Sequence, residues 1–285
     1  SLDLERTEAN QGRSYGNLER ADKDFALAWI RNYGRGRTFY CTIAHNPYVF
    51  WDPKMLEFYL GAVQFALGDL DAPTLPSGKL TPALRAQEKL GWRLGLAAET
   101  FPQATFFEAI DQTAKLGVPY IGGWSSQKLS REIPKNFGPD LTDEELKQAR
   151  FKLDAAGVRL LTFSLPAMPG DEAGCRKLFE FGRKMGIEAF ISDPAPEALN
   201  TIGKFCDEYR INMALRGQDR TAASRYVSPE AVLRACEGRT ARIGACVDLG
   251  PWLRAGIDPV QAVRKLKQRV IAVIPGDMNE PGAGK

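Results

Sequence analysis

Histidine is almost absent from this sequence, because His45 is the single histidine among its 285 residues. Histidine is the side chain whose ordinary pKa lies closest to neutral pH, and its imidazole is a common metal ligand. Residues 91–285 therefore contain neither a histidine general base nor an imidazole ligand. His45 itself follows an apolar run in the motif AHNPYVF, where a turn or packing role is more common than a catalytic one.

Paired cysteines are absent as well. The five cysteines are odd in number, widely spaced and never arranged as CxxC: Cys41, Cys175, Cys206, Cys236 and Cys246. This excludes a disulfide framework and a cysteine zinc site, and it predicts buried free thiols.

Long apolar runs and long basic runs are also missing. No stretch approaches the roughly 18 residues that a membrane-spanning helix needs, so no membrane partner is expected. The 38 basic and 35 acidic residues are interspersed, which excludes a nucleic-acid partner. A content of 44% hydrophobic and 26% charged residues is typical of a soluble globular protein, for which a cytoplasmic location is favoured. The start at Ser1, without methionine or a signal-like segment, indicates a processed product or a piece of a longer chain.

The first 70 residues contain a predicted hairpin and a helix. Two aromatic-rich apolar runs, 25–30 and 38–44, are joined by a glycine-containing turn and predict paired strands. Asp52-Pro53 then opens a helix with apolar residues at three- and four-residue spacing, and Gly68 ends it. Residues 71–82 hold three prolines and a glycine without apolar periodicity. We therefore predict a segment 1–70, a linker 71–90 and a second domain 91–285.

Short apolar strands alternate with amphipathic helices from residue 94 onward. The predicted strands are 94–98, 119–121, 158–165, 187–192, 211–215, 243–247 and 270–274. Helix starts are marked by the capping boxes at Thr105 and Thr142 and by Ser228-Pro229. Such repeats predict a parallel α/β sheet, and no GxGxxG follows the first strand to indicate dinucleotide binding. The domain is shorter than the usual (β/α)8 barrel of about 250 residues and stops after the seventh predicted strand.

Four stretches together resemble the xylose isomerase-like barrel family of sugar phosphate isomerases and epimerases. They are TFFEAIDQTAKLGVPYIGGW, QKLSREIPKNFGPDLTDEELKQARFKLDAAGVRL, SRYVSPEAVLRACEGRTARIGACVDLGPW and GIDPVQAVRKLKQRVIAVIPGDMNE. Residues 29–70, WIRNYGRGRTFYCTIAHNPYVFWDPKMLEFYLGAVQFALGDL, are similar to the last part of a ThuA-like (trehalose-utilisation) domain. The resemblance implies an incomplete (β/α)8 TIM barrel that lacks strand eight, preceded by an α/β segment of a ThuA-like fold.

The same resemblance implies a divalent metal held by carboxylates and histidine at the carboxyl ends of the strands. At those positions this chain has Gly122 for a glutamate, Arg216 for a glutamate or histidine, Pro251 for a histidine and Ile274 for a histidine. Asp248 keeps its carboxylate. The substitutions predict a pseudoenzyme, without a cofactor and without assigned catalytic residues, that acts as a non-catalytic carbohydrate-binding or scaffold protein.

An active enzyme remains the alternative. A metal-dependent sugar isomerase or epimerase would hold manganese or magnesium by carboxylates alone, at Asp193, Asp248, Asp277 and Glu280. The competing interpretation is that these carboxylates cap helices or form ion pairs with Arg216, Arg254 and Lys128. For Arg216, an ion pair with Asp248 competes with an anion site.

The ligand of such a barrel would be a carbohydrate or a sugar phosphate. The candidate substrate-binding residues are Arg216, Lys128, Trp124 and Trp252, where the tryptophans would stack on a sugar ring or else belong to the core. Further partners would be a second copy of the chain or the remainder of a longer chain, because exposed sheet edges need cover.

Overall fold

The computed structural model describes residues 25–33, 36–43, 45–70, 72, 74, 81–217 and 225–275. The chain divides into two compact units, Ser1–Leu94 and Gly95–Lys285. Helix α3 (Pro82–Leu90) of the first unit lies within the stretch whose composition suggested a linker. None of the helices built by the described residues is long and apolar enough to cross a membrane.

The first unit begins with the expected hairpin. Strands β1 (Ala28–Tyr33) and β2 (Gly36–Cys41) pair antiparallel, and their side chains alternate between a half-buried and an exposed face. On the exposed face Trp29 and Tyr40 lie opposite each other with stacked rings, 5.3 Å between centroids. On the other face Phe39 packs edge-on against Phe58 at 5.5 Å.

Phe58 belongs to α2 (Pro53–Leu67), which follows a short 3-10 helix η1 (Pro47–Trp51). The α2 boundaries confirm the sequence signals. The Asp52 carboxylate accepts hydrogen bonds from the first backbone N–H groups, and Gly68 ends the helix with φ 91°. The helix also carries a second apolar stripe whose side chains are exposed: Leu56, Leu60, Val63 and Leu67.

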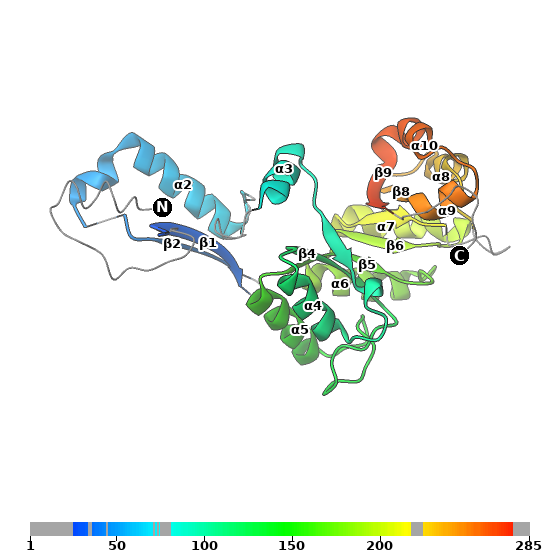
Figure 1. Ribbon diagram of the computed structural model, residues 1–285, viewed down its shortest axis with the longest axis horizontal. Coiled ribbons are helices and arrows are strands. Elements are labelled where there is room, and N and C mark those ends of the chain that lie inside the picture. The colour runs from blue at the N-terminus through cyan, green and yellow to red at the C-terminus, as the bar shows by residue number, and fades with distance from the viewer. Residues whose placement is uncertain are drawn as a thin grey trace. The chain divides into compact units, whose positions relative to one another are not determined.

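The second unit is built on one seven-stranded parallel sheet whose strands follow chain order (Figure 1). The strands are β3 (Gly95–Ala97), β4 (Tyr120–Trp124), β5 (Arg159–Ser164), β6 (Ala189–Ser192), β7 (Asn212–Leu215), β8 (Ile243–Asp248) and β9 (Val270–Ile274). All seven strands predicted from the sequence are confirmed. No eighth strand occurs in the part of the chain that the structure describes, so the fold is an incomplete (β/α)8 barrel.

Helices connect the strands as the βα rhythm predicts. They are η3 (Ala98–Thr100), α4 (Phe106–Lys115), α5 (Asp143–Ala156), α6 (Glu172–Met185), η4 (Pro196–Ala198), α7 (Leu199–Tyr209), α8 (Pro229–Cys236), α9 (Leu249–Arg254), α10 (Pro259–Leu266) and η5 (Lys267–Arg269). Both capping boxes are present, with Thr105 bonded to Glu108 and Thr142 to Glu145. The Ser228 hydroxyl accepts a hydrogen bond at the start of α8, which confirms the third predicted cap.

Two apolar layers cover the two faces of this sheet. The larger layer lies between strands and helices and includes a set of aromatic rings in which Phe106 and Phe137 stack at 4.0 Å. The smaller layer consists of Ile191, Ala214 and Cys246, with Ile271, Ala272 and Ile274 packed against them. Because successive side chains of a strand point to opposite faces, this smaller layer marks the inner face of the half-barrel.

Candidate ligand site at the carboxyl ends of the strands

All seven strands end at the same edge of the sheet, because they run parallel; we call this edge the barrel mouth. Catalytic and binding residues of TIM barrels lie at this edge. The side-chain alternation identifies which residues face inward there. Ala214 and Cys246 belong to the inner layer, so Arg216 and Asp248, each two residues further on, continue the same face.

Arg216 follows β7 directly and is held there by its backbone, whose N–H donates to the Ser192 carbonyl at 3.0 Å. Its side chain reaches the end of the neighbouring strand β8. Nε donates to Asp248 Oδ2 at 3.0 Å, and a terminal nitrogen lies 2.8 Å from the same oxygen. The Arg216–Asp248 ion pair expected from the sequence is therefore present.

Glu99 completes this group, and the sequence reasoning did not single it out. The other terminal nitrogen of Arg216 lies 3.4 Å from Glu99 Oε2. Glu99 sits in η3, just after β3, whereas Arg216 follows β7. In a flat sheet four strand intervals of about 4.8 Å would separate these strands by roughly 19 Å, so the contact requires the sheet to curl. One local signal in the sequence could have identified Glu99: it is the first charged residue after the first predicted strand.

The three charges are partly withdrawn from water. The side chains of Arg216, Asp248 and Glu99 are 25%, 10% and 32% exposed. Burial alone would lower the pKa of the Arg216 guanidinium, but attraction to Asp248 and Glu99 outweighs burial and raises the pKa. The guanidinium stays charged, and this group of one cation and two carboxylates has a net charge of about −1.

A second ion pair lies one strand away. The Asp193 carboxylate, after β6, accepts a hydrogen bond from the Arg225 backbone N–H at 3.1 Å, and the Arg225 guanidinium lies 3.7 Å from its other oxygen. The neighbouring Tyr226 hydroxyl donates to the Pro194 carbonyl at 2.8 Å. Burial, and secondly the Asp193 charge, raises the pKa of Tyr226 to about 12. Gly217 permits this packing, because a Cβ there would lie 2.6 Å from the Tyr226 backbone.

The described residues do not fit the divalent metal that the family resemblance implies. Asp248 and Asp193 each bind a different arginine, and the described ranges contain no group of three or more His, Cys, Asp or Glu side chains able to hold a metal. A guanidinium between two carboxylates also repels a dication. Asp277 and Glu280, the other two candidate ligands, lie outside the described residues, so the all-carboxylate site of the alternative stays a prediction.

The remaining candidates have different positions. Trp124 ends β4 and is half-buried. A Cβ at Gly123 would face Phe137 and Phe163 of the outer layer, so the adjacent Trp124 faces inward, toward the mouth. Lys128 is exposed in the loop after β4, where its carbonyl accepts a hydrogen bond from Phe106 N–H. Trp252, by contrast, is only 3% exposed and packs in the outer core.

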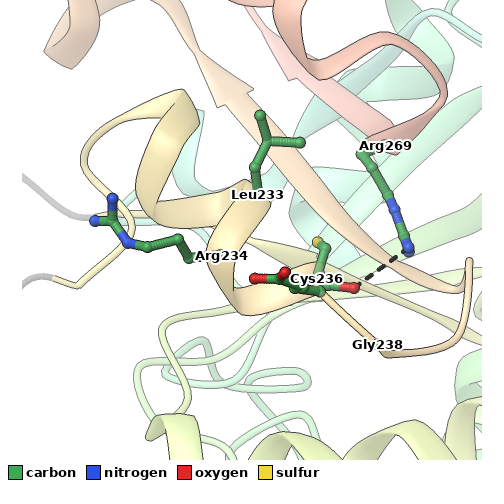
Figure 2. A pocket seen from close by; sticks show the side chains of 6 residues that line it. Leu233, Arg234, Cys236, Gly238 and Arg269 are labelled. Atoms are coloured by element: carbon green, nitrogen blue, oxygen red, sulfur yellow. Dashed lines mark hydrogen bonds between the residues drawn. The ribbon is translucent and has the colours of Figure 1, made fainter.

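A surface depression of about 390 Å³ lies at the opposite, amino end of the strands (Figure 2). It is lined by Leu233, Arg234, Cys236, Glu237, Gly238 and Arg269. Both terminal nitrogens of Arg269 are engaged there, since they donate to the carbonyls of Thr240, Ile243, Cys236 and Arg239. We therefore assign this arginine a structural role.

Comparisons with known proteins define the class of the fold. No protein-family model matches the chain, and no curated protein matches it. Among solved structures, an uncharacterised protein from Parabacteroides distasonis is 27% identical, with a TM-score of 0.55 over 64% of this chain and 73% of that chain.

Two further structures carry the names of sugar epimerases. A D-tagatose 3-epimerase-like protein is 15% identical, with a TM-score of 0.52 over 67% of this chain and 78% of that chain. A D-psicose 3-epimerase is 15% identical, with a TM-score of 0.53 over 66% of this chain and 76% of that chain. At this identity the likeness shows the fold alone, which is the TIM barrel that these epimerases share with this chain. The resemblance of residues 29–70 to a ThuA-like domain stays a prediction.

Proposed function

We propose that the barrel mouth is a non-catalytic binding site for a neutral carbohydrate. The observation that carries the proposal is the Arg216 guanidinium bonded to both Asp248 and Glu99. These groups offer donors and acceptors side by side, which is the pattern that vicinal hydroxyl groups require. The fold likeness to a D-tagatose 3-epimerase-like protein and to a D-psicose 3-epimerase studied with D-fructose supports a sugar as the ligand.

The charge of the site favours a neutral sugar over a sugar phosphate. Sequence reasoning left open an anion bound to Arg216. In the structure two carboxylates compensate this arginine, and a phosphate with about 1.5 to 2 negative charges would meet a net negative group. Lys128, the basic residue that the sequence suggested for substrate binding, is exposed, so solvent and salt screen its charge.

Trp124 supplies the apolar part of the proposed site. Its ring is half-buried at the inward face of β4, and an indole presents an apolar surface on which the C–H face of a sugar can pack. Binding sites commonly combine such an aromatic surface with a few placed polar groups.

We infer that the site is non-catalytic from the ion pairing of Asp248 and from the apolar side chain at Ile274. Moving a proton at a sugar carbon requires a base near the operating pH and a group that polarises the neighbouring oxygen. The Asp248 carboxylate is already held in an ion pair, because a terminal nitrogen of Arg216 lies 2.8 Å from its Oδ2, so this oxygen is not free to take a proton from a sugar carbon. Ile274, paired in register with Asp248 at the end of β9, has no polar atom to contribute.

The proposal also includes partners for the first unit. Trp51 and Leu67 are 77% and 73% exposed, which is expensive for isolated apolar side chains in water. We propose that the remainder of a longer chain, of ThuA-like type, or a second copy covers this surface, and that the barrel also serves as a scaffold for that partner.

Calorimetric titration of the full chain with D-fructose and with fructose 6-phosphate tests the carbohydrate proposal. We expect D-fructose to bind more tightly than its phosphate, and we expect Trp124→Ala to reduce the affinity at least 10-fold. Trp92→Ala is the matched control, because Trp92 is 72% exposed and lies in the first unit. Tighter binding of the phosphate, equal effects of both tryptophan variants, or epimerisation of the bound sugar would contradict the proposal.

A further inference from the structure

We propose that Arg216 is a built-in cation that neutralises Glu99 and Asp248, and that replacing it by a neutral residue converts the barrel mouth into a divalent-cation site. This inference concerns the three charged side chains themselves and does not require that the mouth binds a sugar. If the inference is right, the positive charge of Arg216 is what prevents a divalent metal from binding, and replacing this one side chain tests it.

The carboxylates of Glu99 and Asp248 lie on either side of the Arg216 guanidinium. Glu99 follows the first strand of the sheet and Asp248 ends the sixth, yet one guanidinium reaches both, with nitrogen–oxygen distances of 3.4 and 2.8 Å. The two carboxylates therefore face each other across a single cation. Without that cation, two negative charges would remain close together at a site where Asp248 is only 10% exposed.

The backbone, not Arg216, positions these carboxylates. Asp248 is the last residue of β8 and is paired in register with Ile274 of β9. Glu99 lies in η3, which is closed by a hydrogen bond from Phe101 N–H to the Ala98 carbonyl. Cys246, two residues before Asp248, anchors β8 in the inner apolar layer. Removing the arginine side chain therefore leaves both residues at the barrel mouth, where one cation can take the place of the guanidinium.

The chemistry of the remaining oxygens suits a divalent cation. Carboxylate oxygens are hard ligands that suit Mg²⁺ or Mn²⁺, and magnesium is commonly held by one or two carboxylates with water completing its coordination. Two carboxylates and water predict weak binding, in the millimolar range.

The neighbouring pair of Asp193 and Arg225 provides a matched control. It also lies at the mouth, but among the described residues the Arg225 guanidinium forms an ion pair with one carboxylate, that of Asp193. Arg225→Met therefore leaves a single carboxylate and should not create a site of comparable affinity.

The experiment uses the full chain as wild type, Arg216→Met, Arg225→Met and the double variant Arg216→Met/Glu99→Gln. Melting temperatures are recorded with MnCl₂ and with KCl at equal ionic strength, and Mn²⁺ binding is counted by electron paramagnetic resonance. For Arg216→Met we expect one bound Mn²⁺ and a rise in melting temperature of about 3 to 5 °C at ten times the dissociation constant. The other three proteins should show neither effect.

Three results would overturn the inference: no Mn²⁺ bound by Arg216→Met, equal binding by wild type, or equal binding by the double variant. If Arg216→Met does not fold in KCl, its circular dichroism in MnCl₂ decides the question. Recovery of the folded signal by Mn²⁺ supports the inference, and no recovery overturns it. A failure here leaves the wild-type titration with D-fructose unaffected, so the two proposals fail separately.

Discussion

Replacing Arg269 by methionine should destabilise the barrel far more than an average surface substitution. Arg269 ends η5, just before β9, and its guanidinium donates four hydrogen bonds to carbonyls around the end of α8 and the start of β8. Figure 2 shows the bond to the Cys236 carbonyl. Methionine keeps the length of the aliphatic chain but removes every one of these donors.

The structure gives the size of the effect. The bonds to Thr240 and Ile243 measure 2.7 and 3.0 Å, whereas those to Cys236 and Arg239 both measure 3.3 Å and are weaker. A hydrogen bond from a charged donor contributes about 1.5 to 3 kcal/mol, and bonds that share one group are not additive. Because Arg269 is also partly exposed, we expect a loss of about 2 to 4 kcal/mol in the free energy of unfolding.

Hydrogen–deuterium exchange of the full chain, read on peptides that cover residues 229–248, measures this loss locally and avoids the mixed transitions of a two-unit chain. Arg234→Met is the control, since Arg234 is an exposed arginine on α8, the helix whose carboxyl end Arg269 binds. A change below about 0.5 kcal/mol for Arg269→Met, or an equal loss for Arg234→Met, would refute the reasoning.

Three further outcomes are expected. Gly182→Ala should cost about 1 to 3 kcal/mol in urea denaturation, because its Cβ would lie 2.7 Å from Phe190, whereas Gly203→Ala, with its nearest atom at 3.4 Å, should be neutral or stabilising; equal effects would contradict this. Burial raises the pKa of Cys175 to about 11 and those of Cys206 and Cys246 to about 12. A thiol reagent at pH 8 should therefore label only the half-buried Cys41 rapidly in the folded chain, and all five cysteines after denaturation; fast labelling of a second thiol in the native state would be inconsistent with these values. Residues 1–75 expressed alone should give a poorly dispersed amide spectrum, because a hairpin and one helix leave apolar faces uncovered; a well-dispersed monomer that melts cooperatively would refute this.

Local signals explain why the strands and helix ends could be predicted from the sequence. Capping residues such as Thr105 and Ser228 act within three residues of themselves, so their effect does not depend on the rest of the fold. The strands 94–98 to 270–274 are short apolar runs between such signals, and each of the seven begins within two residues of its predicted start. Three prolines and a glycine in residues 71–82 indicated a linker that was extended to residue 90, and the short helix α3 within it was not predicted.

The site could be predicted only where it involves neighbouring strands. Arg216 and Asp248 follow adjacent strands, so parallel pairing alone brings them to one edge, and their ion pair was expected. The contact between Glu99 and Arg216 joins residues 117 positions apart in the sequence. It depends on the curl of the whole sheet, and no local sequence pattern predicts that curl. The sequence could not distinguish the two tryptophans, because each follows or ends a predicted strand. In the structure Trp252 lies in α9 and packs in the outer core, whereas Trp124 lies at the end of β4, at the mouth.

The metal content of the purified wild-type chain tests the central claim most directly. The full chain is incubated with Mn²⁺ or Mg²⁺, freed of unbound ions and examined by elemental analysis, with Asp248→Ala alongside. We predict that wild type retains no stoichiometric metal, because the Arg216 guanidinium already neutralises Asp248 and Glu99. One equivalent of metal retained by wild type and lost in Asp248→Ala would contradict the account and favour a metal-dependent sugar isomerase or epimerase.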